Sequence, residues 1–103
     1  MRFMIQFSIP TQYGNEVVRS GKVDKVFKKL GEDLKPEAMY FYPDEGLRAG
    51  CIFIQSDNPA IGVAVGERLW LGLQAQVKIT PVMNGEELGK GLSEVAKIIQ
   101  NYA

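Results

Sequence analysis

The sequence contains no histidine and only one cysteine, Cys51. The absence of histidine removes the commonest general base, the usual base of a serine triad and the most frequent protein ligand of zinc. A single cysteine excludes an intramolecular disulfide framework and, without histidine, a structural zinc site of the usual type. We therefore expect no metal and no other cofactor. Cys51 lies beside apolar residues of a predicted strand, so we expect a buried structural thiol rather than a nucleophile.

The chain also lacks a surplus of charge and any long apolar run. Twelve Lys and Arg residues balance twelve Asp and Glu residues. Proteins that bind nucleic acids or anionic membranes through basic surfaces normally carry a basic surplus. The longest apolar runs, 51–54 and 61–65, are too short to span a bilayer, and the start of the chain does not have the pattern of a signal peptide. We expect a cytoplasmic protein that binds neither nucleic acid nor membrane.

The 103 residues have the composition of one globular domain, with 46% hydrophobic and 23% charged residues. Residues 2–9 alternate as a strand, which Pro10 ends. Residues 11–34 are predicted to be helical with an interruption at Ser20-Gly21, and the part from Lys22 carries one apolar stripe. Pro36 stops this helix.

The middle of the chain is predicted to form a hairpin of strands 37–43 and 48–55, joined by a turn over residues 43–46. Asp57-Asn58-Pro59 then resembles a helix start in which an Asx residue caps the helix and Pro takes its first position. The helix over 60–73 is apolar around most of its circumference. A strand over 74–82 follows, and Asn84 with Glu87 is close to a capping box that opens an amphipathic closing helix.

This order of elements predicts an α+β, ferredoxin-like βαββαβ fold over residues 1–103. Its four-stranded antiparallel sheet has the first and third strands at the centre, both crossover helices on one face and an extra C-terminal helix. The other sheet face is too apolar to be fully solvated. We expect a second subunit to cover it, with the two sheets packed face to face as a homodimer.

Several segments also resemble an uncharacterised family of small bacterial proteins. The segments are Met1-Arg2-Phe3-Met4, Leu34-Lys35-Pro36-Glu37-Ala38, Asp57-Asn58-Pro59 and Thr80-Pro81-Val82-Met83 before Glu86-Glu87-Leu88. Those proteins look like members of the ferredoxin-like dimeric α/β-barrel superfamily, which also contains muconolactone-isomerase-like enzymes, small monooxygenases and ligand-binding modules. The resemblance implies the fold and the dimer. It transfers no catalytic residue, because the catalytic histidines have no counterpart here.

The first candidate site is a cleft on the free sheet face that could bind a small hydrophobic ligand, with Lys78 as its anion partner. The alternative is a plain dimer interface. The strand register decides whether tyrosines 40 and 42 or Phe41 face the cleft, and the sequence leaves this open. The predicted lining residues are Gln6, Tyr40, Tyr42, Phe53, Gln76 and Lys78.

A second candidate is the hairpin tip, where Tyr42, Asp44 and Glu45 lie near Arg48 and could perform acid–base chemistry on an oxyanion. The alternative is a solvated tip with an exposed ion pair, which contributes little to stability. On the apolar helix, Trp70, Leu69 and Val63 are predicted interface residues, since tryptophan is enriched where proteins meet.

These features favour a small homo-oligomeric module with a structural, binding or interaction role and no catalysis of its own. The alternative is a small enzyme of isomerase or cofactor-free monooxygenase type, with a hydrophobic substrate cleft on the sheet face.

Overall fold

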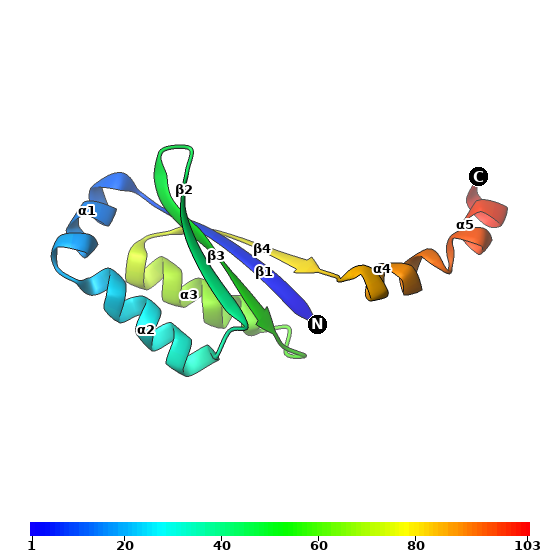
Figure 1. Cartoon of the computed structure of the whole chain (residues 1–103), viewed down its shortest axis with the longest axis horizontal. Helices are drawn as coiled ribbons and strands as arrows, with labels where there is room; N and C mark the ends of the chain where they lie inside the picture. The colour runs from blue at the N-terminus through cyan, green and yellow to red at the C-terminus, as the bar shows by residue number, and fades with distance from the viewer.

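Four antiparallel strands form one open sheet in the computed structural model, which describes all residues from Met1 to Ala103. Helices flank the strands in an α+β arrangement (Figure 1). The elements are β1 (Arg2–Ile9), α1 (Thr11–Arg19), α2 (Lys22–Leu34), β2 (Ala38–Asp44), β3 (Leu47–Gln55), α3 (Ile61–Leu73), β4 (Gln76–Val82), α4 (Gly85–Leu92) and α5 (Val95–Tyr102).

The strands lie in the order β2-β3-β1-β4, so β1 and β3 are central, as the sequence predicts. β2 and β4 are the edge strands, and each contains a proline, Pro43 and Pro81. Proline is tolerated at such positions because its nitrogen can face away from the ladder. All three pairings are antiparallel.

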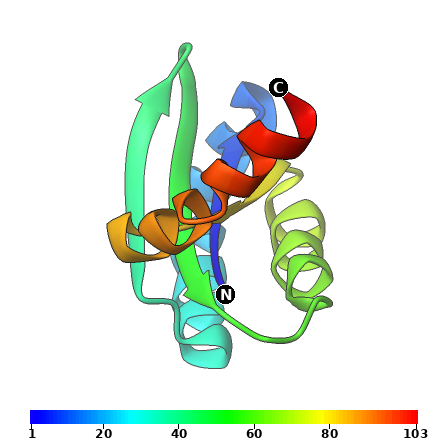
Figure 2. The same ribbon diagram turned by 90° about the vertical axis from the view of Figure 1, so that its right-hand side faces the viewer.

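Helices α1, α2 and α3 lie on one face of the sheet (Figures 1 and 2). The alternation of β1 explains why. Phe3, Ile5, Phe7 and Ile9 point to that face, whereas Arg2, Met4, Gln6 and Ser8 point to the other. The hydrophobic core fills the space between the sheet and these helices. The core residues are Ile5, Phe7, Ile9, Val17, Phe27, Leu30, Ile52, Ile54, Val65, Leu69, Leu73 and Ala75.

The predicted break between α1 and α2 is confirmed. Gly21 adopts a φ of 77°, a conformation that L side chains rarely adopt. The break lets α1 and α2 pack on the sheet with different directions, with Val17 buried from α1, and Phe27 and Leu30 buried from α2.

The hairpin turn is shorter than predicted. Pro43 and Asp44 belong to β2, and only Glu45 and Gly46 form the turn, with φ values of 49° and 79°. Two successive residues with positive φ are typical of a type I′ hairpin, whose twist matches that of the flanking strands. The register of the hairpin therefore pairs Pro43 with Arg48.

The start of α3 also differs from its prediction. Asn58 accepts a hydrogen bond from the amide of Ala60 at 3.0 Å, which makes a local Asx turn instead of a helix cap. The helix begins at Ile61, and its N-cap residue, Ala60, has no side-chain cap. Although this helix is apolar around most of its circumference, its outer face with Val63, Trp70 and Leu71 is exposed in the protomer.

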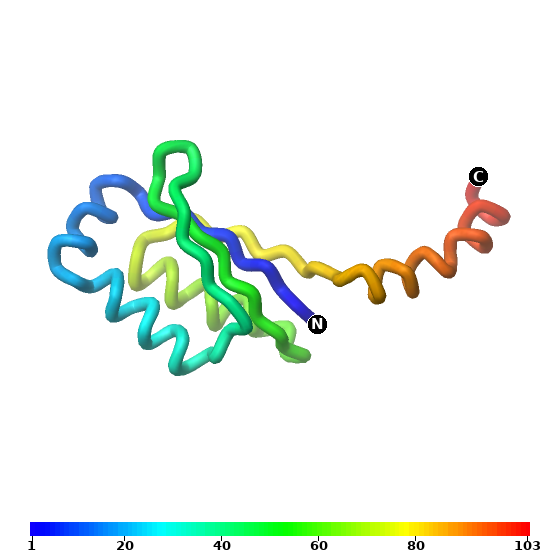
Figure 3. Tube along the Cα trace, viewed as in Figure 1, coloured from blue at the N-terminus to red at the C-terminus, as the bar shows by residue number.

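The closing helix is divided into α4 and α5, and both extend away from the sheet (Figures 1 and 3). The predicted capping box at Asn84 is confirmed, with the Glu87 amide donating to Asn84 Oδ1 at 2.9 Å. Neither helix has a buried residue. We call residues 84–103 the arm. The apolar stripe of the arm covers no part of its own protomer.

Candidate functional site

The free face of the sheet carries rows of side chains that the strand register aligns across all four strands. Gln6 lies opposite Cys51 on one side and Lys78 on the other, and Cys51 lies opposite Tyr40. One row therefore runs Tyr40, Cys51, Gln6, Lys78 from edge to edge of the sheet. The register also settles the orientation of β2: Tyr40 and Tyr42 face the free side, whereas Phe41 faces the helices and packs against Phe27.

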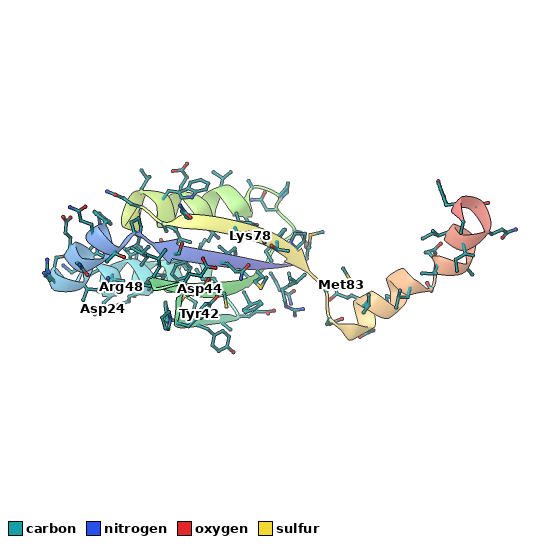
Figure 4. The ribbon with its side chains drawn as sticks, turned by 90° about the horizontal axis from the view of Figure 1, so that it is seen from above. Asp24, Tyr42, Asp44, Arg48, Lys78 and Met83 are labelled. Carbon is teal, nitrogen blue, oxygen red and sulfur yellow. The ribbon has the colours of Figure 1, made fainter.

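The next row gives this face a polar hollow with a volume of about 360 Å³. In this row Tyr42 lies opposite Ala49, which lies opposite Ser8, and Ser8 lies opposite Gln76. Figure 4 shows Tyr42 and Asp44 on one edge strand and Lys78 on the other. The residues that line the hollow are Gln6, Phe7, Ser8, Tyr42, Asp44, Gln76, Val77 and Lys78.

Four of the six predicted cleft residues line this hollow: Gln6, Tyr42, Gln76 and Lys78. The other two lie beside it on the same face, where the rings of Tyr40 and Phe53 meet edge to face with centroids 6.3 Å apart. The structure thus brings all six onto one face but divides them into a polar hollow and an aromatic pair.

Two further residues join the hollow. Asp44 was assigned from the sequence to the hairpin tip, and Ser8 was not among the predicted cleft residues. The alternation of β1 puts Ser8 on the same face as Gln6, which was the available signal. The extension of β2 to Asp44 could not be read from the sequence, because Pro43 suggested a turn.

The phenol of Tyr42 is held in its protonated form. Partial removal from solvent raises the pKa of Tyr42, the thiol of Cys51 and the carboxylate of Asp44 raise it further, and a hydrogen bond with Gln6 acts in the opposite direction. A phenol with a raised pKa serves as a hydrogen-bond donor rather than as a base at neutral pH.

Lys78 forms no ion pair in the structure. Its ammonium group and the Tyr42 phenol provide two donors to the hollow, together with the amides of Gln6 and Gln76. This set can hold an anionic or carbonyl oxygen. No group of three or more potential metal-ligating side chains occurs in the structure.

The predicted interface residues of α3 lie away from this face. Val63 and Trp70 are exposed, and the Trp70 ring folds back over Gly66 of the same helix. Leu69 is 0% exposed and belongs to the protomer's own core. Because α3 covers the opposite side of the sheet, Val63 and Trp70 cannot belong to a contact made by the free sheet face (Figure 2).

The hairpin tip does not assemble the predicted acid–base group. Arg48 makes no ion pair with Glu45 or any other residue. Its side chain instead lies along α1, where a Cβ on Gly14 would be 2.9 Å from Arg48 Nη1. Asp44 and Tyr42 face the polar hollow, so the candidate tip residues are divided between two regions.

Comparison of the sequence with known protein families and with curated proteins finds no match. None of the helices has the length and apolar character needed to cross a membrane.

Proposed function

We propose that this chain is a cytoplasmic, non-catalytic binding module of ferredoxin-like fold that works as a homodimer with the free faces of two sheets packed together. The observation that carries the proposal is that every helix packed on the sheet lies on the opposite face. The free face is left with the aromatic pair of Tyr40 and Phe53 beside the polar row of Gln6 and Lys78.

The sheet order supports a ferredoxin-like topology. Read from the β4 edge, the order is β4-β1-β3-β2, with a helical crossover from β1 to β2 and another from β3 to β4. Two β-α-β units that share one antiparallel sheet in this manner define the split arrangement of that fold.

A second copy is the occupant that fits the free face. The solvated face of an antiparallel sheet normally carries polar side chains, whereas this face also carries the apolar or aromatic side chains of Met4, Tyr40 and Phe53. Two such faces related by a two-fold axis place each aromatic pair against the partner sheet, and sheets pack in this way about 10 Å apart. The polar hollows would then be enclosed between the sheets.

The arm supports association as well. Helices of eight residues are marginal in water unless they bury an apolar face. The arm leaves the sheet at the end of β4, at Met83, and extends past the end of the sheet (Figure 4). In a dimer its stripe would lie on the partner. The residues of that stripe are Leu88, Leu92, Val95, Ile98, Ile99 and Tyr102.

Solution mass tests the proposal, with two variants of matched exposure on opposite sides of the molecule. Tyr40 on the free face is 58% exposed and Val63 on α3 is 61% exposed. Light scattering across a wide concentration range should give a dimer for the wild type, a monomer for Tyr40→Glu and a dimer for Val63→Glu. Near-ultraviolet circular dichroism should show retained packing in each variant. A monomeric wild type, or a dimer broken only by Val63→Glu, would refute the sheet-to-sheet contact.

A second candidate function is supported by the presence of Tyr42, Asp44 and Lys78 in the lining of one hollow. A protonated phenol and an unpaired ammonium that line the same hollow could stabilise a developing enolate oxygen, as an isomerase or a cofactor-free monooxygenase requires. Exchange of α-protons of small cyclic ketones in D₂O would test it. Catalysed exchange that is lost in both Tyr42→Phe and Lys78→Gln would support the enzyme, and exchange at the uncatalysed rate would exclude this chemistry for the substrates used.

A further inference from the structure

A larger hollow lies on the helix side of the hairpin, between α1, α2 and the turn that joins β2 to β3. Its volume is about 680 Å³, within the range of small-molecule sites. It lies within one protomer. Apolar residues form most of its wall, among them Phe7, Ile9, Val23, Phe27 and Phe41.

The wall of this groove is aromatic and partly open. Phe27 lies between Phe7, with ring centroids 5.2 Å apart, and Phe41, with centroids 4.9 Å apart in an edge-to-face arrangement. Phe7 and Phe27 are buried, whereas Phe41 on the edge strand is 57% exposed. An apolar ligand that entered the groove would cover the Phe41 ring and contact an already ordered aromatic cluster.

The groove contains one charged side chain, Arg48, and no Asp or Glu. Its guanidinium makes no hydrogen bond or ion pair with the protein. Asp24, which is labelled near Arg48 in Figure 4, forms no ion pair with it. Gly14 has no side chain, which leaves room for the arginine to lie along α1 at the edge of the groove.

We propose that this groove binds a small hydrophobic carboxylic acid, with its apolar body against Phe41 and Phe27 and its carboxylate on Arg48. A planar guanidinium offers two parallel N–H donors that match the two carboxylate oxygens. Thr11 and Asn15 add hydrogen-bonding groups on the α1 side of the groove. A neutral ligand would contact the same apolar residues but would offer no anionic group to Arg48.

Phenylacetate and its neutral analogue phenylacetamide test the proposal on the 103-residue chain. Titration followed by ¹H–¹⁵N correlation spectra should show saturable binding of phenylacetate, with shifts at residues 41 and 47–49. A hydrogen bond to a charged group is typically worth a factor of about ten to a hundred, so phenylacetamide and the Arg48→Gln variant should both bind more weakly by about that factor.

Two further variants separate this groove from the polar hollow. Lys78→Gln removes the cation of the hollow and should leave the affinity for phenylacetate unchanged. Gly14→Ala keeps the positive charge but places a methyl group where the guanidinium lies, so it should weaken binding by less than Arg48→Gln does. Alanine also favours the helix at this position, so loss of the fold is not the expected cause.

Three results would overturn the proposal. One is equal binding of the acid and the amide, and another is binding that Lys78→Gln weakens and Arg48→Gln does not. The third is absence of phenylacetate binding together with a Phe41→Ser variant that lowers the solution mass, since the groove would then be a contact between copies.

Discussion

The ring of Phe7 packs against the backbone of Gly50, the residue directly opposite it in the pairing of β1 with β3. A Cβ on Gly50 would lie 2.6 Å from Cζ of Phe7 and would also meet the carbonyl of Tyr40. The ring thus occupies the place of a side chain on the central strand. This arrangement joins the sheet to the aromatic cluster of α2.

Gly50→Ala is expected to lower the free energy of unfolding by about 1–3 kcal/mol, because the added methyl group overpacks a filled core. Chemical denaturation followed by circular dichroism measures the change. Gly89→Ala is the control, since no atom lies within 4 Å of its added Cβ. Equal stability of the two variants would contradict the packing of Phe7 on Gly50.

Glu37 is expected to make stability depend on pH in the acidic range. A hydrogen bond from Arg2, whose Nε lies 2.9 Å from Oε2, and another from Gln55 lower the pKa of Glu37. A carboxyl whose pKa is lower in the folded state stabilises the fold above its unfolded pKa, and this contribution is lost as the pH falls.

The stability difference between wild type and Glu37→Gln should therefore shrink as the pH falls from about 5 to about 3. Urea denaturation at closely spaced pH values measures it, with Glu16→Gln as a control because Glu16 has no ion pair. A difference that stays constant, or grows on acidification, would exclude the proposed role of Glu37.

Asn84→Ala should fray α4 and leave the sheet intact. Loss of a helix cap typically lowers helix stability by about 1 kcal/mol. Because α4 has no buried residue, its fraying should not destabilise the core. Amide exchange at residues 86–88 should accelerate by about fivefold, while the exchange of β1 and β3 stays unchanged. Asn101→Ala, which removes no hydrogen bond, is the matched control. Faster exchange throughout the sheet would mean that the arm and the sheet unfold together.

Ile98→Ser should weaken the proposed dimer with little effect on the protomer. Ile98 is exposed on α5, and surface substitutions usually change stability by less than about 0.5 kcal/mol. If the arm lies on a partner, the dissociation constant from sedimentation should rise, and Lys97→Ala on the polar side should leave it unchanged. An unaltered dissociation constant for Ile98→Ser would show that the arm takes no part in the dimer.

Local sequence patterns predicted the strands, the break at Gly21 and the cap at Asn84, because each depends on residues close together in the chain. The alternation of β1 also predicted which side chains share the free face. The position of the arm relative to the sheet depends on the whole molecule. The apolar stripe from Leu88 to Tyr102 indicates that this side of the arm needs a packing partner, but it does not identify the element that provides it. Arg48 was assigned to the hairpin tip because it lies across the predicted turn from Asp44 and Glu45, whereas the fold places its side chain along Gly14.

Within the candidate site, the alternation of side chains along the strands predicted which residues share the free face of the sheet, but it did not predict the polar hollow. The division of the face arises from the register of β2, in which Tyr42 pairs with the small Ala49 and Tyr40 lies near Phe53. A one-residue change of register would have reversed every side chain of that strand. Pro43, which suggested an early turn in the sequence, is accommodated within the strand because β2 lies at the edge.

The two edge prolines limit how the sheet can grow. An exposed edge strand offers a row of unpaired backbone groups on which another chain can add, the first step toward a fibre. Pro43 and Pro81 each remove one donor from the outer row of β2 and β4. Each open edge thus lacks one of the donors that an added strand would need, which disfavours open-ended polymers that grow through the edges.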